Sequence, residues 1–364
     1  MIEHIDWELL AYPLPSAVGG SGVRVVDLIA CTLRTKDGGT GFGFSYAIGG
    51  RGAASLLAAR EIAEELVAGH APGHPEATWR RLRAACNQTG RGPNFVGLAA
   101  LDVALWDLHA RALGVPLCVA MGGAPRAVAV YGSGGYAPGQ PPEAVATQIA
   151  RHRAQGFRAV KLRLAGIPAD EACLAAARDA CGSELILMAD LNEKASLTAA
   201  RRTIASLLDK GGSLVEEPLP AHDIAGYRAL ARAFPGVIAT GEHLQGLDDA
   251  RTFLVGGLCS AIQPDLAMAG GLTESLRIAR FAEALGVEVM PHFLPGLFVH
   301  LAAAAPNVTW LEHFPLLEPL LDGLPEPNPD GLIRPGTAAG HGLSLKPDAR
   351  TRFAGTPKRE RRGG

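Results

Sequence analysis

The sequence has no excess of charge of either sign. Its 364 residues include 34 Lys and Arg against 36 Asp and Glu, which gives a formal net charge of −2 at pH 7. Binding to nucleic acid without sequence preference depends on a surplus of cations that neutralise phosphates, and this chain has no such surplus. We therefore expect no nucleic-acid partner.

Paired cysteines and long apolar runs are also missing. The six cysteines are scattered and form no Cys-x-x-Cys pair, so we expect buried free thiols and no disulfide framework. No run of about 18 apolar residues occurs that could span a membrane. The N-terminus, MIEHIDWELLAYPLP, has acidic residues where a signal peptide needs positive charge. We expect a soluble cytoplasmic protein with no membrane partner.

Glycine and proline, in contrast, are abundant. The chain has 45 Gly and 26 Pro, about a fifth of its residues, against about 12% in an average protein. The apolar content of 48% excludes wholesale disorder, so these residues indicate many tight turns in a folded chain. The length fits two domains, or one barrel-sized domain with attachments.

The pattern of apolar residues changes near residue 125. Before it, apolar residues recur at helical spacing over 53–68 and 95–113, after a strand-like stretch at 25–33, so we expect this first part to be largely helical. After it, short apolar runs alternate with amphipathic segments of about a dozen residues, as in consecutive βα units. We place a domain boundary there.

Eight strand candidates follow this boundary. They lie at 127–132, 159–164, 185–190, 213–217, 237–242, 261–265, 287–292 and 308–312. Helical segments such as 143–155 and 273–285 lie between them, which requires parallel strands with crossover connections. Eight evenly spaced strands favour a closed barrel. An open doubly wound sheet is the second choice, because no Gly-x-Gly-x-x-Gly turn follows the first strand and Gly41-Phe42-Gly43 is too weak a substitute.

An ionisable residue stands at the end of seven of these strands, with 20 to 29 residues between successive members. They are Lys161, Asp190, Glu216, Glu242, Asp265, His292 and Glu312. Each interval is about one βα unit, so all seven side chains are expected at the C-terminal mouth of the barrel, where barrel active sites lie. Acids that merely cap the following helices would explain single members but not seven in register.

Three neighbouring acids, Asp190, Glu216 and Glu242, indicate a metal site. Carboxylates at close range raise one another's pKa unless a cation lies between them. Three oxygen donors with room for water and substrate suit Mg²⁺, or Mn²⁺, better than Zn²⁺. Glu217 competes with Glu216, because alternation along a strand lets only one of the two face inward.

On the other side of the mouth, His292 and Asp265 come from adjacent units, and the carboxylate can orient the imidazole as a base. Lys161 and Arg163 share one face of their strand and place two cations beside an anionic substrate. Three further histidines are expected to serve packing or hydrogen bonding: His243, His300 and His313.

Taken together, the motifs ALDVALWDLHARALGVPL with MGG, MADLN, VEEPLP, TGEH, IQPD with MAGG, MPH and WLEHF extend over nearly the whole chain. With them the chain resembles the enolase superfamily, and within it the mandelate racemase group. The resemblance implies an α+β capping domain (1–124), a modified (β/α)₇β TIM-type barrel (125–325) and a C-terminal segment (326–364) that returns to the cap and ends in a frayed basic tail.

The resemblance also implies roles for individual residues. Mg²⁺ would be held by Asp190, Glu216 and Glu242, His292 and Asp265 would form the catalytic dyad, and Glu312 would lie near the substrate carboxylate and bind it if protonated. The superfamily uses a Lys or His base with Mg²⁺ that stabilises an enediolate. We therefore expect a small carboxylate as the substrate, and a homo-oligomer.

One position departs from the group's pattern. Its usual Lys-x-Lys is here Lys161-Leu162-Arg163, and a guanidinium does not serve as a second base. We therefore expect a dehydratase of an aldonate or aldarate, in which His292 removes the α-proton, the β-hydroxyl leaves and a 2-keto-3-deoxy acid forms. Lys161 and Arg163 would add positive charge, and Asn192 would donate a hydrogen bond. A racemase, epimerase or cycloisomerase is the alternative, and a non-catalytic barrel a remote one.

Two loops of the capping domain would set specificity in such an enzyme. They correspond to residues 12–22 and 44–51, where Tyr46 and Arg51 are candidates for substrate contact. Arg51 could bind the distal carboxylate of a diacid.

Overall fold

The computed structural model describes residues 1–18 and 21–355. The basic tail, 356–364, lies outside these residues, and so do Gly19 and Gly20 in the first of the two expected loops. In the described residues all six cysteines are buried and free, which confirms that prediction. None of the helices described there is long and apolar enough to cross a membrane.

The chain begins with an antiparallel sheet of three strands in the order β1-β2-β3. Its strands are β1 (Ile2–Val18), β2 (Val23–Thr35) and β3 (Thr40–Ile48). Only the central strand was expected, and the prediction of loops at 12–22 and 44–51 is wrong for 12–18 and 44–48, which are strand. The helices expected over 53–68 and 95–113 are confirmed as Gly52–Leu66 and Gly92–Leu113. β1 carries prolines and charged residues, which an edge strand tolerates and which obscure the apolar alternation, whereas β3 is interrupted by Gly41 and Gly43.

Four helices complete the cap. They are α1 (Gly52–Leu66), α2 (Pro75–Ala85), α3 (Gly92–Leu113) and α4 (Leu117–Ala120). Helices α1 and α3 pack on this sheet, and α2 and α4 pack against α3. A Cβ atom at Gly41 or Gly43 of β3 would overlap the backbone of α3 at Ala104 or Ala100. These two glycines therefore allow helix and strand to approach closely. The Gly41-Phe42-Gly43 motif thus serves packing in the cap.

Eight parallel strands form the barrel, as predicted. They are β4 (Val128–Gly132), β5 (Ala159–Arg163), β6 (Ile186–Asp190), β7 (Leu214–Glu216), β8 (Ile238–Thr240), β9 (Ala261–Ile262), β10 (Glu288–Val289) and β11 (Trp310–His313). The sheet runs β10-β9-β8-β7-β6-β5-β4-β11, and a parallel bridge between Val289 and Val308 links its two ends.

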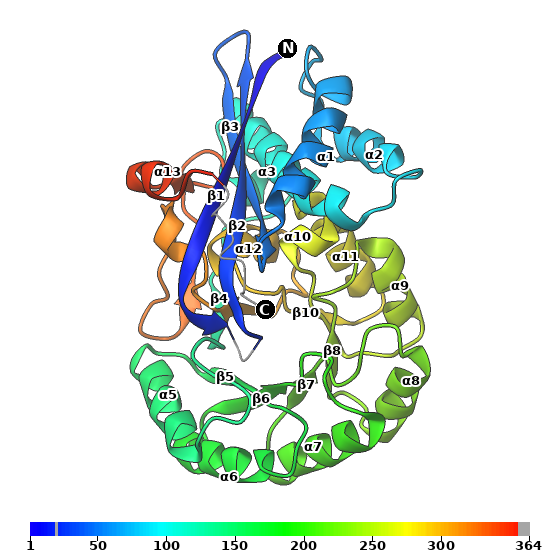
Figure 1. Ribbon diagram of the computed structural model, residues 1–364, viewed down its shortest axis with the longest axis vertical. Coiled ribbons are helices and arrows are strands. Elements are labelled where there is room, and N and C mark those ends of the chain that lie inside the picture. The colour runs from blue at the N-terminus through cyan, green and yellow to red at the C-terminus, as the bar shows by residue number, and fades with distance from the viewer. Residues whose placement is uncertain (19–20, 356–364) are drawn as a thin grey trace, which may run out of the picture.

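Helices connect successive strands and surround the sheet (Figure 1). They are α5 (Pro142–Ala154), α6 (Asp170–Cys181), α7 (Leu197–Asp209), α8 (Ile224–Ala233), α9 (Leu247–Val255), α10 (Leu266–Ala269), α11 (Leu272–Ala284) and α12 (Pro295–Ala304). The arrangement is the expected (β/α)₇β barrel. Its interior is filled by a cluster of buried side chains: Tyr131, Ala159, Met188, Leu214, Ala239, Ala261 and Met290.

The C-terminal part of the described chain lies against both the barrel and the cap. It contains η1 (Glu318–Leu320), β12 (Leu321–Asp322), β13 (Leu332–Ile333), β14 (Ser344–Leu345) and α13 (Pro347–Phe353). Strand β13 pairs with β4 of the barrel. Arg350 of α13 donates to Glu8 of β1, and Gly355 forms a bridge with Leu10. The cap is therefore held in place from both ends of the chain.

Candidate active site

The register of the barrel brings the ends of three strands into line. Arg163 of β5 is paired with Asp190 of β6, and Asp190 is paired with Glu216 of β7. Glu242 follows two residues after the end of β8. All three acids are buried, so the strands place three carboxylates side by side at the C-terminal mouth. This is the placement that the sequence spacing predicts.

Lys161 lies below this mouth and is fully enclosed. Its side chain is 1% exposed and forms ion pairs with Glu216 and, at 2.7 Å, with Glu312. Glu312 also accepts a hydrogen bond of 2.9 Å from the backbone of Phe293. Burial alone would raise the pKa of Glu312, but the Lys161 ammonium lowers this pKa to about 2. The expected protonated Glu312 is therefore not favoured here, because an adjacent cation stabilises its charged form.

The three carboxylates each keep one buried oxygen without a hydrogen-bond partner. These atoms are Asp190 Oδ2, Glu216 Oε1 and Glu242 Oε2. Two of them still lie 3.0 Å from a cationic nitrogen, of Arg163 and His292 respectively, so ion pairing accounts for part of their surroundings. Hard oxygen donors with free lone pairs are what Mg²⁺ requires. The donor set therefore fits that ion.

Burial and neighbouring charges shift the pKa values of these acids in opposite directions. Burial and the nearby carboxylates raise the pKa of Glu216 to about 8, although Lys161 opposes the shift. Burial also acts to raise the pKa of Glu242, but His292 and His243 lower it to about 2. Burial therefore dominates the pKa of Glu216, and the neighbouring imidazoles dominate that of Glu242. Strongly shifted pKa values of this kind cluster at functional sites.

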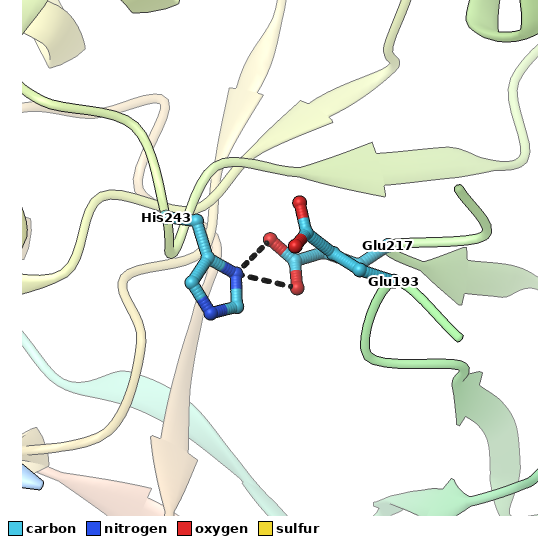
Figure 2. A group of neighbouring side chains, drawn as sticks. All are labelled: Glu193, Glu217 and His243. Atoms are coloured by element: carbon cyan, nitrogen blue, oxygen red, sulfur yellow. Dashed lines mark hydrogen bonds and ion pairs between the residues drawn. The ribbon is translucent and has the colours of Figure 1, made fainter. Parts of the chain in front are cut away.

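A second cluster lies next to these acids, formed by Glu193, Glu217 and His243 (Figure 2). In the described part of the chain it is the one group whose potential metal-ligand atoms all lie within 4.8 Å of one another. His243 Nδ1 is 2.9 Å from both carboxylate oxygens of Glu217. Sequence reasoning missed this cluster, although each member closely follows one of the three predicted ligands along the chain.

The choice between Glu216 and Glu217 is explained by the backbone. Strand β7 ends at Glu216, whose side chain accepts a hydrogen bond of 2.8 Å from Gln263 of the neighbouring unit. Glu217 has a φ of 40°, a left-handed conformation that is uncommon for residues other than glycine, and its side chain turns to His243. The two acids therefore point to different neighbours.

His292 is held as a base would need to be. Its Nδ1 lies 2.7 Å from Asp265 Oδ2, and Asp265 Oδ1 accepts a hydrogen bond from the backbone of Met268. Burial alone would lower the pKa of His292, but Glu242 and Asp265 raise it to about 10. Tyr46 of the cap donates its hydroxyl to the same Asp265 oxygen. The two residues of the predicted dyad are thus in contact, and Tyr46 of the cap is a third member of the same hydrogen-bond network.

A cavity of about 420 Å³ opens between the barrel mouth and the cap. From the barrel it is lined by Arg163, Asn192, Glu242, His243, Asp265, Ala267, Met268, His292 and Phe314, and from the cap by Val18, Ser21, Val23, Tyr46, Ala47, Ile48 and Val96. Asn192 donates to Glu242 over 2.9 Å. Arg51 is exposed and is not among the lining residues, so the distal contact expected of it is not formed.

Two family models match this chain. Residues 6–122 match the mandelate racemase/muconate lactonizing enzyme N-terminal domain, and residues 144–349 match the enolase C-terminal domain-like model. The chain belongs to the mandelate racemase group of the enolase superfamily. This confirms the resemblance seen in the sequence motifs, and it makes the chain an enzyme of that superfamily.

Similar proteins include both lyases and isomerases. L-talarate/galactarate dehydratase of Salmonella typhimurium is 32% identical over 96% of this chain and 90% of its own length. Its structure liganded with Mg and L-lyxarohydroxamate has a TM-score of 0.91 at 31% identity, covering 98% of this chain and 93% of that one. The 3,6-anhydro-alpha-L-galactonate cycloisomerase of Streptomyces coelicolor is 29% identical over 95% of this chain and 97% of its length. Magnesium, the expected cofactor, is thus the metal found in a solved relative.

Proposed function

We propose that this enzyme removes the α-proton of a sugar acid, an aldonate or aldarate, and eliminates its β-hydroxyl to give a 2-keto-3-deoxy acid. The observation that carries the proposal is that a guanidinium, Arg163, stands where the group's second lysine base would be, next to Asp190, while His292 is oriented by Asp265. Elimination needs one proton acceptor, whereas exchange of the proton on both faces needs two.

Asp190, Glu216 and Glu242 are proposed to hold Mg²⁺. When bound, the ion supplies the positive charge that makes the proton next to the substrate carboxylate more acidic. Support comes from the unpartnered oxygen on each of the three buried acids.

His292 performs the proton transfers in this proposal. In the neutral imidazole, Asp265 accepts the Nδ1 proton and Nε2 carries the lone pair, and this form of His292 receives the proton from the α-carbon. The electron pair of the broken C–H bond forms the C=C bond while the bond between the β-carbon and its hydroxyl breaks. His292 then returns its proton to the departing hydroxyl, water leaves, and the resulting enol rearranges to the keto acid.

Arg163 and Asn192 bind the substrate in this scheme. Both line the cavity next to Glu242, and their side chains are donors suited to carboxylate and hydroxyl oxygens. Arg163 keeps its charge throughout, because a guanidinium does not release its proton at accessible pH. Its role is therefore positioning and charge, with no proton transfer.

A screen of aldonic and aldaric acids with Mg²⁺ tests the proposal. Turnover should give a 2-keto acid that is detected by its semicarbazone, and the His292→Asn variant should give none. If no acid in the library yields a keto acid, and an α-hydroxy acid is instead converted to its epimer, the dehydratase proposal is wrong.

Epimerisation or cycloisomerisation is the second candidate, and the His243–Glu217 pair favours it. His243 also lines the cavity, and its contact with Glu217 repeats the geometry of His292 with Asp265. Two imidazoles could handle a proton on two faces of a substrate. Incorporation of solvent deuterium into the α-position of both epimers, lost in a His243→Asn variant, would establish this alternative.

A further inference from the structure

The two ends of the cavity differ in chemistry. The barrel end carries all of the lining charges, on Arg163, Glu242, His243, Asp265 and His292. The cap end is formed by the tips of the β-strands and by α3, and its side chains are almost entirely apolar: Val18, Val23, Ala47, Ile48 and Val96. A substrate whose carboxylate lies at the barrel end therefore extends its other end toward apolar side chains.

The two hydroxyl groups that the cap contributes are already used within the protein. Ser21 donates to the carbonyl oxygen of Val18 over 2.6 Å and accepts from the backbone of Val23. Tyr46 donates its hydroxyl proton to Asp265. In the described residues, the cap end thus offers no free side-chain hydroxyl for a charged or strongly polar group of the substrate.

The described lining residues also lack a second lysine or arginine. Arg163 is the one lysine or arginine among the described lining residues, and its Nη2 lies 3.0 Å from Asp190 at the barrel end. A carboxylate placed at the cap end would exchange part of its hydration for apolar contacts and gain no charged partner among the described lining residues, which is unfavourable. A methyl or other apolar end would instead gain from burial against the cap residues.

We propose that the substrate is a monocarboxylate with an apolar far end, such as a terminally deoxygenated aldonic acid, and that dicarboxylic aldaric acids are disfavoured. The inference rests on the proposed function, because it takes the barrel end as the place of the reacting carboxylate. It sets this chain apart from the Salmonella relative, whose name gives two dicarboxylic acids as substrates.

A matched pair of inert ligands tests the inference without turnover. 2-Hydroxyhexanoate and 2-hydroxyadipate differ only in the carboxylate at the far end, and neither has a β-hydroxyl to eliminate. Titration calorimetry with the Mg²⁺-loaded enzyme should give at least about tenfold tighter binding for the hexanoate. Equal affinity, tighter binding of the adipate, or no binding of either at millimolar concentration would overturn the proposal.

A second experiment on the same inference introduces a positive charge at the cap end of the cavity. Ile48 is 42% exposed at the end of β3, so polar side chains are tolerated there, and Ile48→Gln is the uncharged control for Ile48→Arg. The arginine variant should tighten binding of 2-hydroxyadipate at least about tenfold, and the glutamine variant should not. Equal changes in both variants, or no change in either, would contradict the proposal.

Sugar acids that differ at one end distinguish this inference from the proposed function. L-rhamnonate with L-mannonate, and L-fuconate with L-galactonate, differ only in a methyl against a hydroxymethyl group, and galactarate supplies the dicarboxylate. The deoxy acids should have the higher kcat/KM. If galactarate is the sugar acid converted to keto acid with the highest kcat/KM, the inference is wrong and the proposed dehydratase activity stands. If 2-hydroxyhexanoate binds tightly but no sugar acid yields a keto acid, the proposed dehydratase activity is wrong and the inference of an apolar far end stands.

Discussion

The barrel end and the cap end of the cavity differ in the kind of sheet that forms them and in the polarity of their side chains. At the barrel end, parallel strands in fixed register bring charged residues from distant parts of the chain to one edge, as with Arg163, Asp190 and Glu216. At the cap end, an antiparallel sheet supplies apolar side chains such as Val23 and Ile48. Under the two proposals above, the barrel residues perform the chemistry and the apolar cap residues select the substrate, so changes in one part should alter the other's role only where the two are in contact.

The sharpest test of this division removes the base at the barrel end. His292→Asn keeps the ring's approximate volume and a donor for Asp265 but has no basic nitrogen, so kcat should fall by about a thousandfold. Steady-state kinetics should show this loss, while calorimetry should show Mg²⁺ and 2-hydroxyhexanoate binding within about threefold of the parent enzyme. Retention of more than a tenth of the activity would place the base elsewhere.

The second test decides which acids hold the metal. Asp190→Asn should weaken Mg²⁺ binding about a hundredfold or more, because changes even outside a metal's ligand shell cost tenfold to a hundredfold. Glu217→Gln is the matched control from the neighbouring cluster, and it should weaken Mg²⁺ binding about tenfold or less. Calorimetric titration of both variants measures this. The reverse order of effects would move the ion to Glu193, Glu217 and His243.

The third test addresses the packing of the cap. In Gly43→Ala the new methyl group would overlap the backbone of α3 at Ala100, and overpacking of this kind costs about 2 kcal/mol of unfolding free energy. Gly92→Ala is the control, because nothing lies within 4 Å of a Cβ atom there. Urea unfolding compares the two variants. If both are equally stable, the close contact between β3 and α3 does not constrain the cap.

The last expected effect is gradual, because it is spread over several pH units, and it concerns the joint between cap and barrel. Asp102 of α3 accepts hydrogen bonds from the backbone and hydroxyl of Thr273, and burial raises the pKa of Asp102 to about 7. The folded state therefore keeps a proton that the unfolded chain releases above about pH 4. The contribution of Asp102 to stability should fall as pH rises, by about 1.4 kcal/mol per pH unit between about pH 4 and 7.

Urea unfolding at several pH values, with Asp102→Asn as the reference, measures this slope. The variant does not titrate at this position, so the difference in unfolding free energy between parent and variant should decrease with rising pH. A difference that is constant with pH would mean that Asp102 has an ordinary pKa in the fold.

The barrel could be predicted from the sequence because each of its elements has a local signal. Its eight strands are short apolar runs at regular intervals, and the acids at their ends share one position in the repeat. The edge strands of the cap have no such signal. In β1, Pro13 lies next to a break in register that extends to Val18, so neither alternation nor spacing marks the strand.

The sequence predicts which residues form the site, but it predicts only some of the contacts between their side chains. The pairing of His292 with Asp265 follows from adjacent βα units. The partners of Lys161 and the turn of Glu217 toward His243 depend on side-chain directions at strand ends, where the backbone leaves regular geometry. The exposure of Arg51 likewise depends on where helix α1 begins.

The hydroxyl of Tyr46 ends on the carboxylate that orients the imidazole, so the cap completes the hydrogen bonding of the barrel's own dyad. Chimeras that join this barrel to the cap of a relative would therefore have to carry a tyrosine at the same point of the third strand. At the active site this phenol constrains the exchange of caps, and recombination between family members has to preserve its contact with Asp265.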